Sequence, residues 1–294
     1  MSTIWQEIRS KMLHSGSKIG LLIGINVGVF LLIAISSVFE LIIFQSRGLI
    51  SSYATEYLAL TAYLPKLAYR FWTPITYMFM HAGFFHILFN MLWLYWMGQI
   101  FEEYLGNKRT IGLYLMGGLA GGILFIATCN LIPAFADMRA IPVVGASTSV
   151  MALVIATATL LPNYTIYLMF IGPVKLKWLA IFYVVIDFIG IAGANAGGEI
   201  AHLGGALLGY IYIKQLQKGN DWNKPFASLA KPASKVKVVY RNDGSYTSRS
   251  SANAYPPPQE EIDRILDKIS HTGYKSLSKQ ERETLQRASN PNEK

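Results

Sequence analysis

The chain has 294 residues, of which 52% are hydrophobic and only 15% charged, and its formal net charge is +9 at pH 7. This composition excludes an ordinary water-soluble globular protein and indicates an integral membrane protein, whose main solvent is lipid. Cys129 is the only cysteine, which excludes an intrachain disulfide.

Six apolar stretches are candidates for membrane-spanning helices, which need about 20 residues to cross a bilayer. They lie at about residues 19–44, 81–103, 110–133, 147–162, 177–193 and 199–216. The fourth and sixth are short, as expected for helices that end inside the protein. The first is longer than the apolar part of a secretory signal, so we expect it to be retained. The sequence therefore predicts an all-α, polytopic membrane protein.

Basic residues in the short loops suggest an orientation, because Lys and Arg resist translocation. With the N-terminus inside, only Arg139 lies in the short loops outside. The cytoplasmic side then holds Arg9, Lys11, Lys18, Lys108, Arg109, Lys175 and Lys177. We expect both termini in the cytoplasm and a bacterial inner (plasma) membrane as the location. The long aromatic first loop, about residues 45–80, is expected at the membrane interface.

Beyond residue 216 the chain becomes polar and basic, with 15 Lys or Arg and 9 Asp or Glu from Lys214 onward. Apolar residues at helical spacing around Ile265 predict a helix that stops at Gly273, and Ser278 with Glu281 forms a capping-box pattern for a second. Anionic lipid or a cytoplasmic protein is the expected partner of this tail; nucleic acid is not expected. The predicted domains are a cytoplasmic segment 1–18, a membrane domain 19–216, a flexible linker 217–257 and a small helical region 258–294.

Polar residues inside the apolar stretches are costly, so each is a functional candidate. His86 and Asn90 lie four apart in HAGFFHILFN and share one helix face, where two donors can converge on one oxygen. An interhelical hydrogen bond would explain either residue alone. His81, five residues before His86, makes that explanation less favourable.

Ser147 opens an apolar helix after a glycine, in IPVVGASTSV. Gly145 permits a tight turn, and a hydroxyl in the first helical turn lies beside free backbone N–H groups at the positive end of the helix dipole. This arrangement favours a nucleophile; a simple helix cap is the alternative. Ser149 lies about 200° further around the helix and cannot share the role.

His202 lies in GGEIAHLGGALLGY, where Gly205 and Gly209 form a stripe of small residues that lets another helix approach closely. An imidazole in that contact could serve as a base, although helix packing alone would also explain it. Two acids remain. Glu199 precedes His202 by three residues and could assist it as a base, but it is expected to make an ordinary pair along its helix. Asp187 is expected to be a protonated or hydrogen-bonded interior acid, with a gate for substrate entry as the alternative.

Taken together, the patterns HAxxxHxxxN, GxSx at a helix start and AHxxGxxxG resemble the rhomboid family of intramembrane serine proteases, over about residues 19–216. The resemblance implies a six-transmembrane-helix rhomboid-like bundle with a short cytoplasmic helical tail. It also implies hydrolysis of peptide bonds in or near transmembrane segments of membrane-protein substrates in the lipid bilayer, without a metal or other cofactor.

The same resemblance assigns roles to matching residues. Ser147 would be the nucleophile and His202 the general base, a dyad without a third carboxylate. His86 and Asn90 would form the oxyanion hole with the Ser147 N–H. Structural support would come from His81, Glu102, Arg70, Gly145, Gly205 and Gly209. The chain departs from the family pattern at Thr148, where glycine is usual, and at Met151, where an aromatic residue is common.

Other functions fit the sequence less well. Zinc proteases are disfavoured because the sequence has no H-E-x-x-H motif, and aspartyl proteases because a pair of intramembrane aspartates is lacking. A transporter is disfavoured because the sequence has no matching pair of interrupted helices. The main alternative is a catalytically inactive rhomboid-like protein that binds membrane clients, although such proteins generally lack the serine or the histidine.

Overall fold

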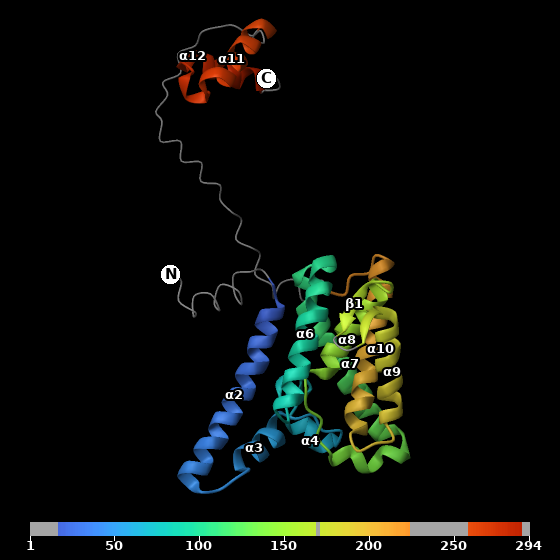
Figure 1. Cartoon of the computed structure of the whole chain (residues 1–294). Helices are drawn as coiled ribbons and strands as arrows, with labels where there is room; N and C mark the ends of the chain where they lie inside the picture. The colour runs from blue at the N-terminus through green and yellow to red at the C-terminus, as the bar shows by residue number, and fades with distance from the viewer. Residues whose placement is uncertain (1–16, 169–170, 224–257, 290–294) are drawn as a thin grey trace. The chain divides into compact units, whose positions relative to one another are not determined.

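A computed structural model describes residues 17–168, 171–223 and 258–289 of the chain, and it is mostly helical (Figure 1). The chain divides into two compact units, Met1–Lys235 and Val236–Lys294. The predicted N-terminal segment and the predicted linker fall mostly outside the described residues. The predicted domain boundaries therefore remain predictions.

Each of the six predicted apolar stretches is a helix, with ends within three residues of the expected ones. These helices are α2 (Ile19–Phe44), α6 (Phe84–Leu105), α7 (Asn107–Leu131), α8 (Ser147–Leu160), α9 (Leu176–Gly190) and α10 (Ala196–Gln217). Between them lie η3 (Pro133–Ala140), which follows α7, and an antiparallel hairpin of β1 (Thr165–Leu168) and β2 (Gly172–Lys175), which joins α8 to α9.

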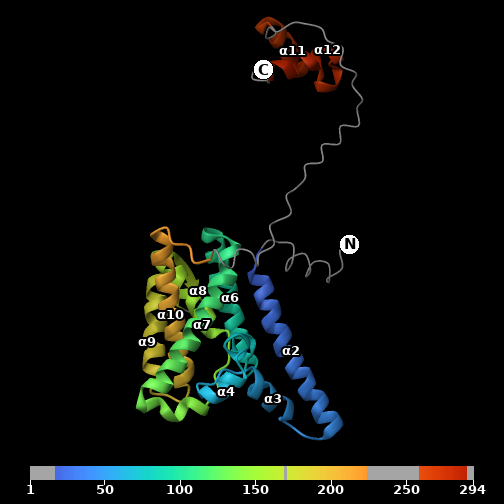
Figure 2. The same cartoon turned by 180° about the vertical axis from the view of Figure 1, so that it is seen from behind.

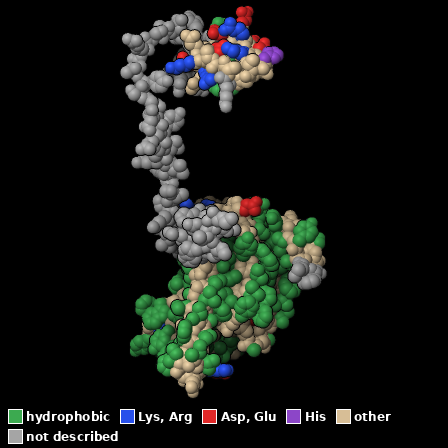
Figure 3. Space-filling model, turned by 60° about the vertical axis from the view of Figure 1, so that its left-hand side comes forward, with side chains coloured by type: hydrophobic (Ala, Val, Ile, Leu, Met, Phe, Trp, Pro, Cys, Tyr) green, Lys and Arg blue, Asp and Glu red, His purple; other side chains and the backbone are tan. Residues whose placement is uncertain are grey.

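Three of the described helices, α2, α6 and α7, are long and apolar enough to cross a membrane by themselves, and α8 is a shorter apolar helix. Large hydrophobic side chains are exposed along α2 and α9 in particular, and hydrophobic side chains gather over the face of the first unit drawn in Figure 3. A surface of this kind suits lipid rather than water. The prediction of six spans is not settled by helix length and remains a prediction.

Helix α8 is the centre of the first unit. Every residue from Thr148 to Ala158 is buried, because α8 packs against α10, α7 and α6. Helix α2 lies at the edge, where it contacts α6 and diverges from it toward α3 (Leu49–Leu58) (Figures 1 and 2). The first residue of α8 is therefore held from several sides, which suits a site that depends on position.

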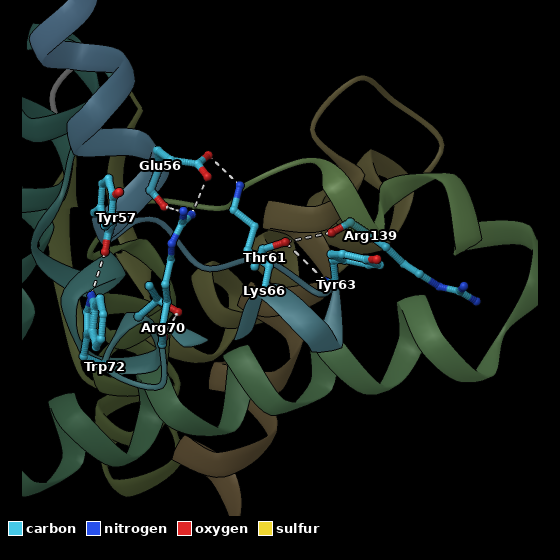
Figure 4. Close-up of polar contacts among 9 residues, drawn as sticks. Glu56, Tyr57, Thr61, Tyr63, Lys66, Arg70, Trp72 and Arg139 are labelled. Atoms are coloured by element: carbon cyan, nitrogen blue, oxygen red, sulfur yellow. Dashed lines mark hydrogen bonds and ion pairs between the residues drawn. The ribbon is translucent and has the colours of Figure 1, made fainter. Parts of the chain in front are cut away.

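The first loop is folded and is not a simple connection. It contains α3, α4 (Leu64–Tyr69), α5 (Thr73–Thr76) and η2 (Tyr77–Phe79). Leu60 forms an antiparallel bridge with Val143, so this loop also holds the segment that leads into α8. Thr61 adds to this link, because its hydroxyl donates to the backbone carbonyl of Arg139 at 2.9 Å (Figure 4).

Glu56 lies at the centre of a group of polar contacts in the first loop, as Figure 4 shows. Its carboxylate contacts Lys66 Nζ at 2.5 Å and Arg70 Nη1 at 2.6 Å. The Arg70 guanidinium lies 4.5 Å from the ring centroid of Tyr57, whose backbone carbonyl accepts a hydrogen bond from Trp72 Nε1 at 2.8 Å. The hydrogen bonds from Lys66 and Arg70 hold the pKa of the Glu56 carboxyl below its usual range.

A Glu56→Gln variant should melt at a slightly lower temperature than the wild type near neutral pH, because exposed ion pairs contribute little. The lowered pKa means that the native pairing stabilises the protein above the ordinary carboxyl pKa and is lost as the pH falls through the folded-state value. The difference between the two proteins should therefore shrink at about pH 4. Thermal melts of purified protein at both pH values test this, with Glu103→Gln as the control. A constant difference would contradict it.

The second unit contains α11 (Gln259–Thr272), η5 (Tyr274–Ser276) and α12 (Lys279–Ser289). Helix α11 ends at Gly273, which has a positive φ of 77°, as the sequence predicts. The predicted capping box is also present: Ser278 N donates to Glu281 Oε2 at 2.7 Å, and Glu281 N donates to Ser278 Oγ at 3.3 Å. Local sequence signals were sufficient for these two helices.

Candidate active site

Helix α8 begins at Ser147, and the two residues before it are held in place by hydrogen bonds. Gly145 N donates to the Tyr77 carbonyl at 2.9 Å, and Ala146 N donates to Nε2 of the buried His81 at 3.4 Å. The first intrahelical bond of α8 runs from the fourth helical residue back to Ala146. The Ser147 N–H therefore lies ahead of the helical ladder, as expected at a helix N-terminus.

Gly145 has a φ of +129°, a conformation that residues with side chains rarely adopt. A Cβ at this position would lie 2.8 Å from His86 Nε2 and 3.3 Å from Ser147 Oγ. The glycine thus serves two needs, the backbone turn and the close approach of His86 to the start of α8.

The hydroxyl of Ser147 meets the imidazole of His202 from α10. Ser147 Oγ lies 2.7 Å from His202 Nε2, a short hydrogen bond. The two residues are 55 positions apart in the chain, so the tertiary fold alone brings them together. The structure therefore places the predicted serine and histidine in direct contact.

Glycines on α10 make this contact possible. A Cβ at Gly205 would overlap the carbonyl oxygen of Thr148, and one at Gly209 would overlap that of Ala152. The backbones of α8 and α10 therefore approach each other without side chains between them, as the stripe of small residues predicts.

Thr148 is accommodated by a glycine on a third helix. Its side chain is 1% exposed, and a Cβ at Gly121 of α7 would overlap its Cγ2 atom. The β-branched residue that departs from the family pattern thus fills space left open by Gly121. Met151, the other departure, is buried and packs with Ile155 and Ala206.

His86 and Asn90 lie near the serine from α6. Asn90 borders the same cavity as Ser147 and His202, and its Nδ2 donates to the His86 carbonyl at 2.8 Å. His86 Nδ1 accepts a hydrogen bond from Ala82 N at 3.4 Å. In a neutral ring the proton is then on Nε2, the nitrogen that faces Gly145. Both side chains can thus offer an N–H beside Ser147.

A cavity of about 440 Å³ opens beside the serine and the histidine. Its wall is mostly apolar and aromatic, with few polar groups, the usual character of a binding site for an organic substrate. The residues that line it are Phe89, Asn90, Trp93, Ser147, Val150, Met151, Val154, Tyr183, Asp187 and His202.

The second nitrogen of His202 faces two acids. Nδ1 lies 3.2 Å from Asp187 Oδ1 of α9, within hydrogen-bond geometry, and 3.4 Å from Oε2 of Glu199, which is on α10 with His202. Glu199 also accepts a hydrogen bond from Asn195 Nδ2 at 3.2 Å. The His202 imidazole therefore lies between a hydroxyl on one side and carboxyl groups on the other.

Two of the predicted support residues lie away from the cavity. Glu102, near the end of α6, accepts a hydrogen bond from Lys18 N at 2.9 Å and so joins that end to the start of α2. Arg70 belongs to the Glu56 network of the first loop. His81, in contrast, is next to the site, with its ring 5.1 Å from that of His86.

The place of Asp187 beside His202 does not follow from the sequence. The sequence predicts a protonated or hydrogen-bonded interior acid at this position, without a partner for it. The available signal was an acid in a helix whose other side chains are almost all apolar, four residues after Tyr183 on the same face. Neither feature identifies the histidine on another helix.

Comparisons with known proteins agree with the motifs. A family model described as "Rhomboid domain" matches residues 68–218, just over half of the chain. A model described as "Family of unknown function (DUF6576)" matches residues 257–291. The chain is 32% identical over 160 residues to "RHOMBOID-like protein 12, mitochondrial" of Arabidopsis thaliana, covering 51% of this chain and 48% of that protein. It is 32% identical over 173 residues to "RHOMBOID-like protein 1" of the same plant, covering 56% and 41%. The chain thus matches about half or less of each relative.

Proposed function

Because this chain belongs to the rhomboid family, we propose that it is an intramembrane serine protease with Ser147 as the nucleophile and His202 as the general base. The observation that carries the proposal is the 2.7 Å contact between Ser147 Oγ and His202 Nε2 at the wall of a cavity. Serine is a weak nucleophile near neutral pH, and a hydrogen-bonded imidazole is the usual means of activating it.

The reaction follows from this geometry. Ser147 Oγ attacks the carbonyl carbon of the scissile bond while its proton passes to His202 Nε2. The C–N bond then breaks as the imidazolium returns that proton to the leaving amine, which leaves an acyl group on Ser147. A water molecule, deprotonated by the same nitrogen, hydrolyses the acyl group and restores the hydroxyl.

The developing oxyanion needs hydrogen-bond donors near the reacting carbonyl. We assign this role to Asn90 Nδ2, His86 Nε2 and the N–H of Ser147. Asn90 uses one proton of its amide for the His86 carbonyl, and the second proton remains for the substrate. The positive end of the α8 dipole adds to the stabilisation.

Asn90→Ala should lower kcat by about 10²–10³-fold, because one donor to the oxyanion is lost. The measurement is the rate of cleavage of a transmembrane substrate in proteoliposomes. Asn130→Ala is the control, since the Asn130 amide on α7 donates to the backbone carbonyls of Ala62 and Ile126, which do not line the cavity. Equal rates for Asn90→Ala and the wild type would mean that Asn90 does not donate a hydrogen bond to the oxyanion.

The substrates proposed are single-pass membrane proteins, cut in or near their transmembrane segments. The apolar, aromatic wall of the cavity suits such a segment better than a charged peptide. Family resemblance suggests small residues before the scissile bond and a helix-weakening sequence nearby. For such access we propose that α8, α9 and α10 lie within the bilayer with α2, α6 and α7, which makes six spans.

We propose that the protein is located in a membrane, and we assign it to no particular cellular compartment. The predicted bacterial membrane gains no support from the relatives, which are plant proteins, one of them named as mitochondrial. The orientation with both termini in the cytoplasm stays a prediction from loop charges. Anionic lipid or a cytoplasmic protein likewise stays the proposed partner of the C-terminal tail.

The test of the function uses the purified full chain in liposomes with a set of single-pass substrates. We expect discrete cleavage products by mass spectrometry and labelling of Ser147 by a fluorophosphonate probe. A folded protein that binds substrates but neither cuts them nor reacts with the probe would favour the alternative, an inactive rhomboid-like protein that binds membrane clients.

A further inference from the structure

We propose that Asp187 is the third member of a Ser147–His202–Asp187 triad, in which it positions His202 and stabilises the imidazolium. This inference rests on the proposed protease function and goes beyond the two-residue dyad implied by the family. Its basis is one chain of contacts across three helices, from α8 through α10 to α9.

The geometry assigns each nitrogen of the imidazole a separate partner. Nε2 lies 2.7 Å from Ser147 Oγ and Nδ1 lies 3.2 Å from Asp187 Oδ1. To accept the serine proton, Nε2 must be unprotonated, so the single proton of the neutral ring must be on Nδ1. A carboxylate that accepts this N–H fixes the productive tautomer and the ring orientation. Asp187 is in the position to do so.

The surroundings of Asp187 support a functional role. Most of α9 presents apolar side chains outward, whereas the Asp187 side chain is only 7% exposed and borders the cavity. Its second oxygen, Oδ2, has no hydrogen-bond partner among the described residues. Keeping an acid inside an apolar helix is costly, and the hydrogen bond with His202 offsets part of this cost.

Glu199 is the competing acid, and three observations favour Asp187. Glu199 Oε2 is farther from Nδ1, at 3.4 Å, and its side chain is more exposed, at 19%. Its other oxygen is engaged by Asn195. It also lies three residues before His202 on the same helix, where acidic and basic side chains pair routinely. We therefore treat Glu199 as a neighbour that the reaction does not need.

In the reaction, Asp187 keeps its negative charge and takes no proton. When His202 receives the serine proton it becomes a cation between Ser147 and Asp187, and the carboxylate stabilises that cation in the transition state. No other bond to Asp187 forms or breaks. It acts through His202 and is a positioning residue.

The test compares Asp187→Asn, Asp187→Glu and Glu199→Gln with the wild type in the liposome cleavage assay. Asp187→Asn should lower kcat by about 10²–10⁴-fold with KM nearly unchanged, since tautomer control matters only in the reacting complex. Asp187→Glu should recover part of the rate because it restores the charge. Glu199→Gln should stay close to wild type. EDTA should not alter wild-type activity, although the two acids and His202 lie close enough to hold a cation.

A second measurement does not depend on activity or on a variant folding. Nitrogen NMR of the wild-type protein labelled at histidine should show His202 as the Nδ1–H tautomer. The Nε2–H tautomer would overturn the triad, as would a normal kcat for Asp187→Asn, an equal loss in Glu199→Gln or inactivation by EDTA. A wild-type protein without any cleavage would overturn the protease function, whereas a cleaving wild type with a normal Asp187→Asn rate would overturn the triad alone.

Discussion

Replacing Ser147 by Ala should abolish cleavage of transmembrane substrates. The expected loss in kcat is about 10⁶-fold, the size seen when a serine protease loses its nucleophile. The Ser147 hydroxyl contacts His202 Nε2, and in the proposed reaction it forms the acyl intermediate. Alanine has no group that can do so. Fluorophosphonate labelling should disappear together with cleavage, and both are measured on protein that still binds substrate.

Ser149→Ala is the matched control for that experiment. Ser149 lies two residues further along α8, is fully buried, and its Oγ has no hydrogen-bond partner among the described residues. Its loss should leave cleavage unchanged. If Ser149→Ala were the inactive variant and Ser147→Ala the active one, the assignment of the nucleophile would be wrong.

Replacing Gly205 by Ala should have the second large effect. The new Cβ would overlap the backbone carbonyl of Thr148, which cannot rotate away as a side chain could. Helices α8 and α10 would have to separate, and the contact between Ser147 and His202 would lengthen. A misplacement of about 1 Å can cost about 10²-fold in rate, and overpacking costs about 1–3 kcal/mol in stability.

Cleavage rate and melting temperature of the Gly205→Ala protein measure both effects. Gly28→Ala on α2 is the control, because a Cβ at that position meets no atom within 4 Å. The control should melt no lower than the wild type, since alanine favours helix more than glycine. A fully active Gly205→Ala protein would mean that the approach of α8 to α10 does not determine the geometry of the site.

The helices could be predicted from the sequence because lipid imposes a strong pattern. Apolar stretches of sufficient length mark α2 to the residue and α7 to within three residues, and the turn at Gly145 marks the start of α8. Ser147 and His202 stand out because each is a polar residue beside glycines in an apolar helix, and the resemblance to the rhomboid family predicts that they pair. Such anomalies are visible without coordinates.

Other contacts could not be predicted because they depend on how helices rotate about their axes. Asp187 faces His202 because of the rotation of α9 against α10, which an almost uniformly apolar helix does not reveal. The same is true of Gly121, which makes room for Thr148 from a third helix. In the first loop, the pairing of Glu56 with Lys66 and Arg70 depends on the fold of a segment that has no repeating pattern.

Helix α8 has 14 residues, which at 1.5 Å per residue is about 21 Å of helix. The hydrocarbon layer of a typical bilayer is about 30 Å thick. In the proposed placement of α8 within the bilayer, with its far end at one headgroup layer, the Ser147 hydroxyl would lie roughly 9 Å beneath the other. In this proposed placement the length of α8 sets the depth of the proposed hydrolysis, and acyl chains of a different length would change how far water must penetrate to reach Ser147.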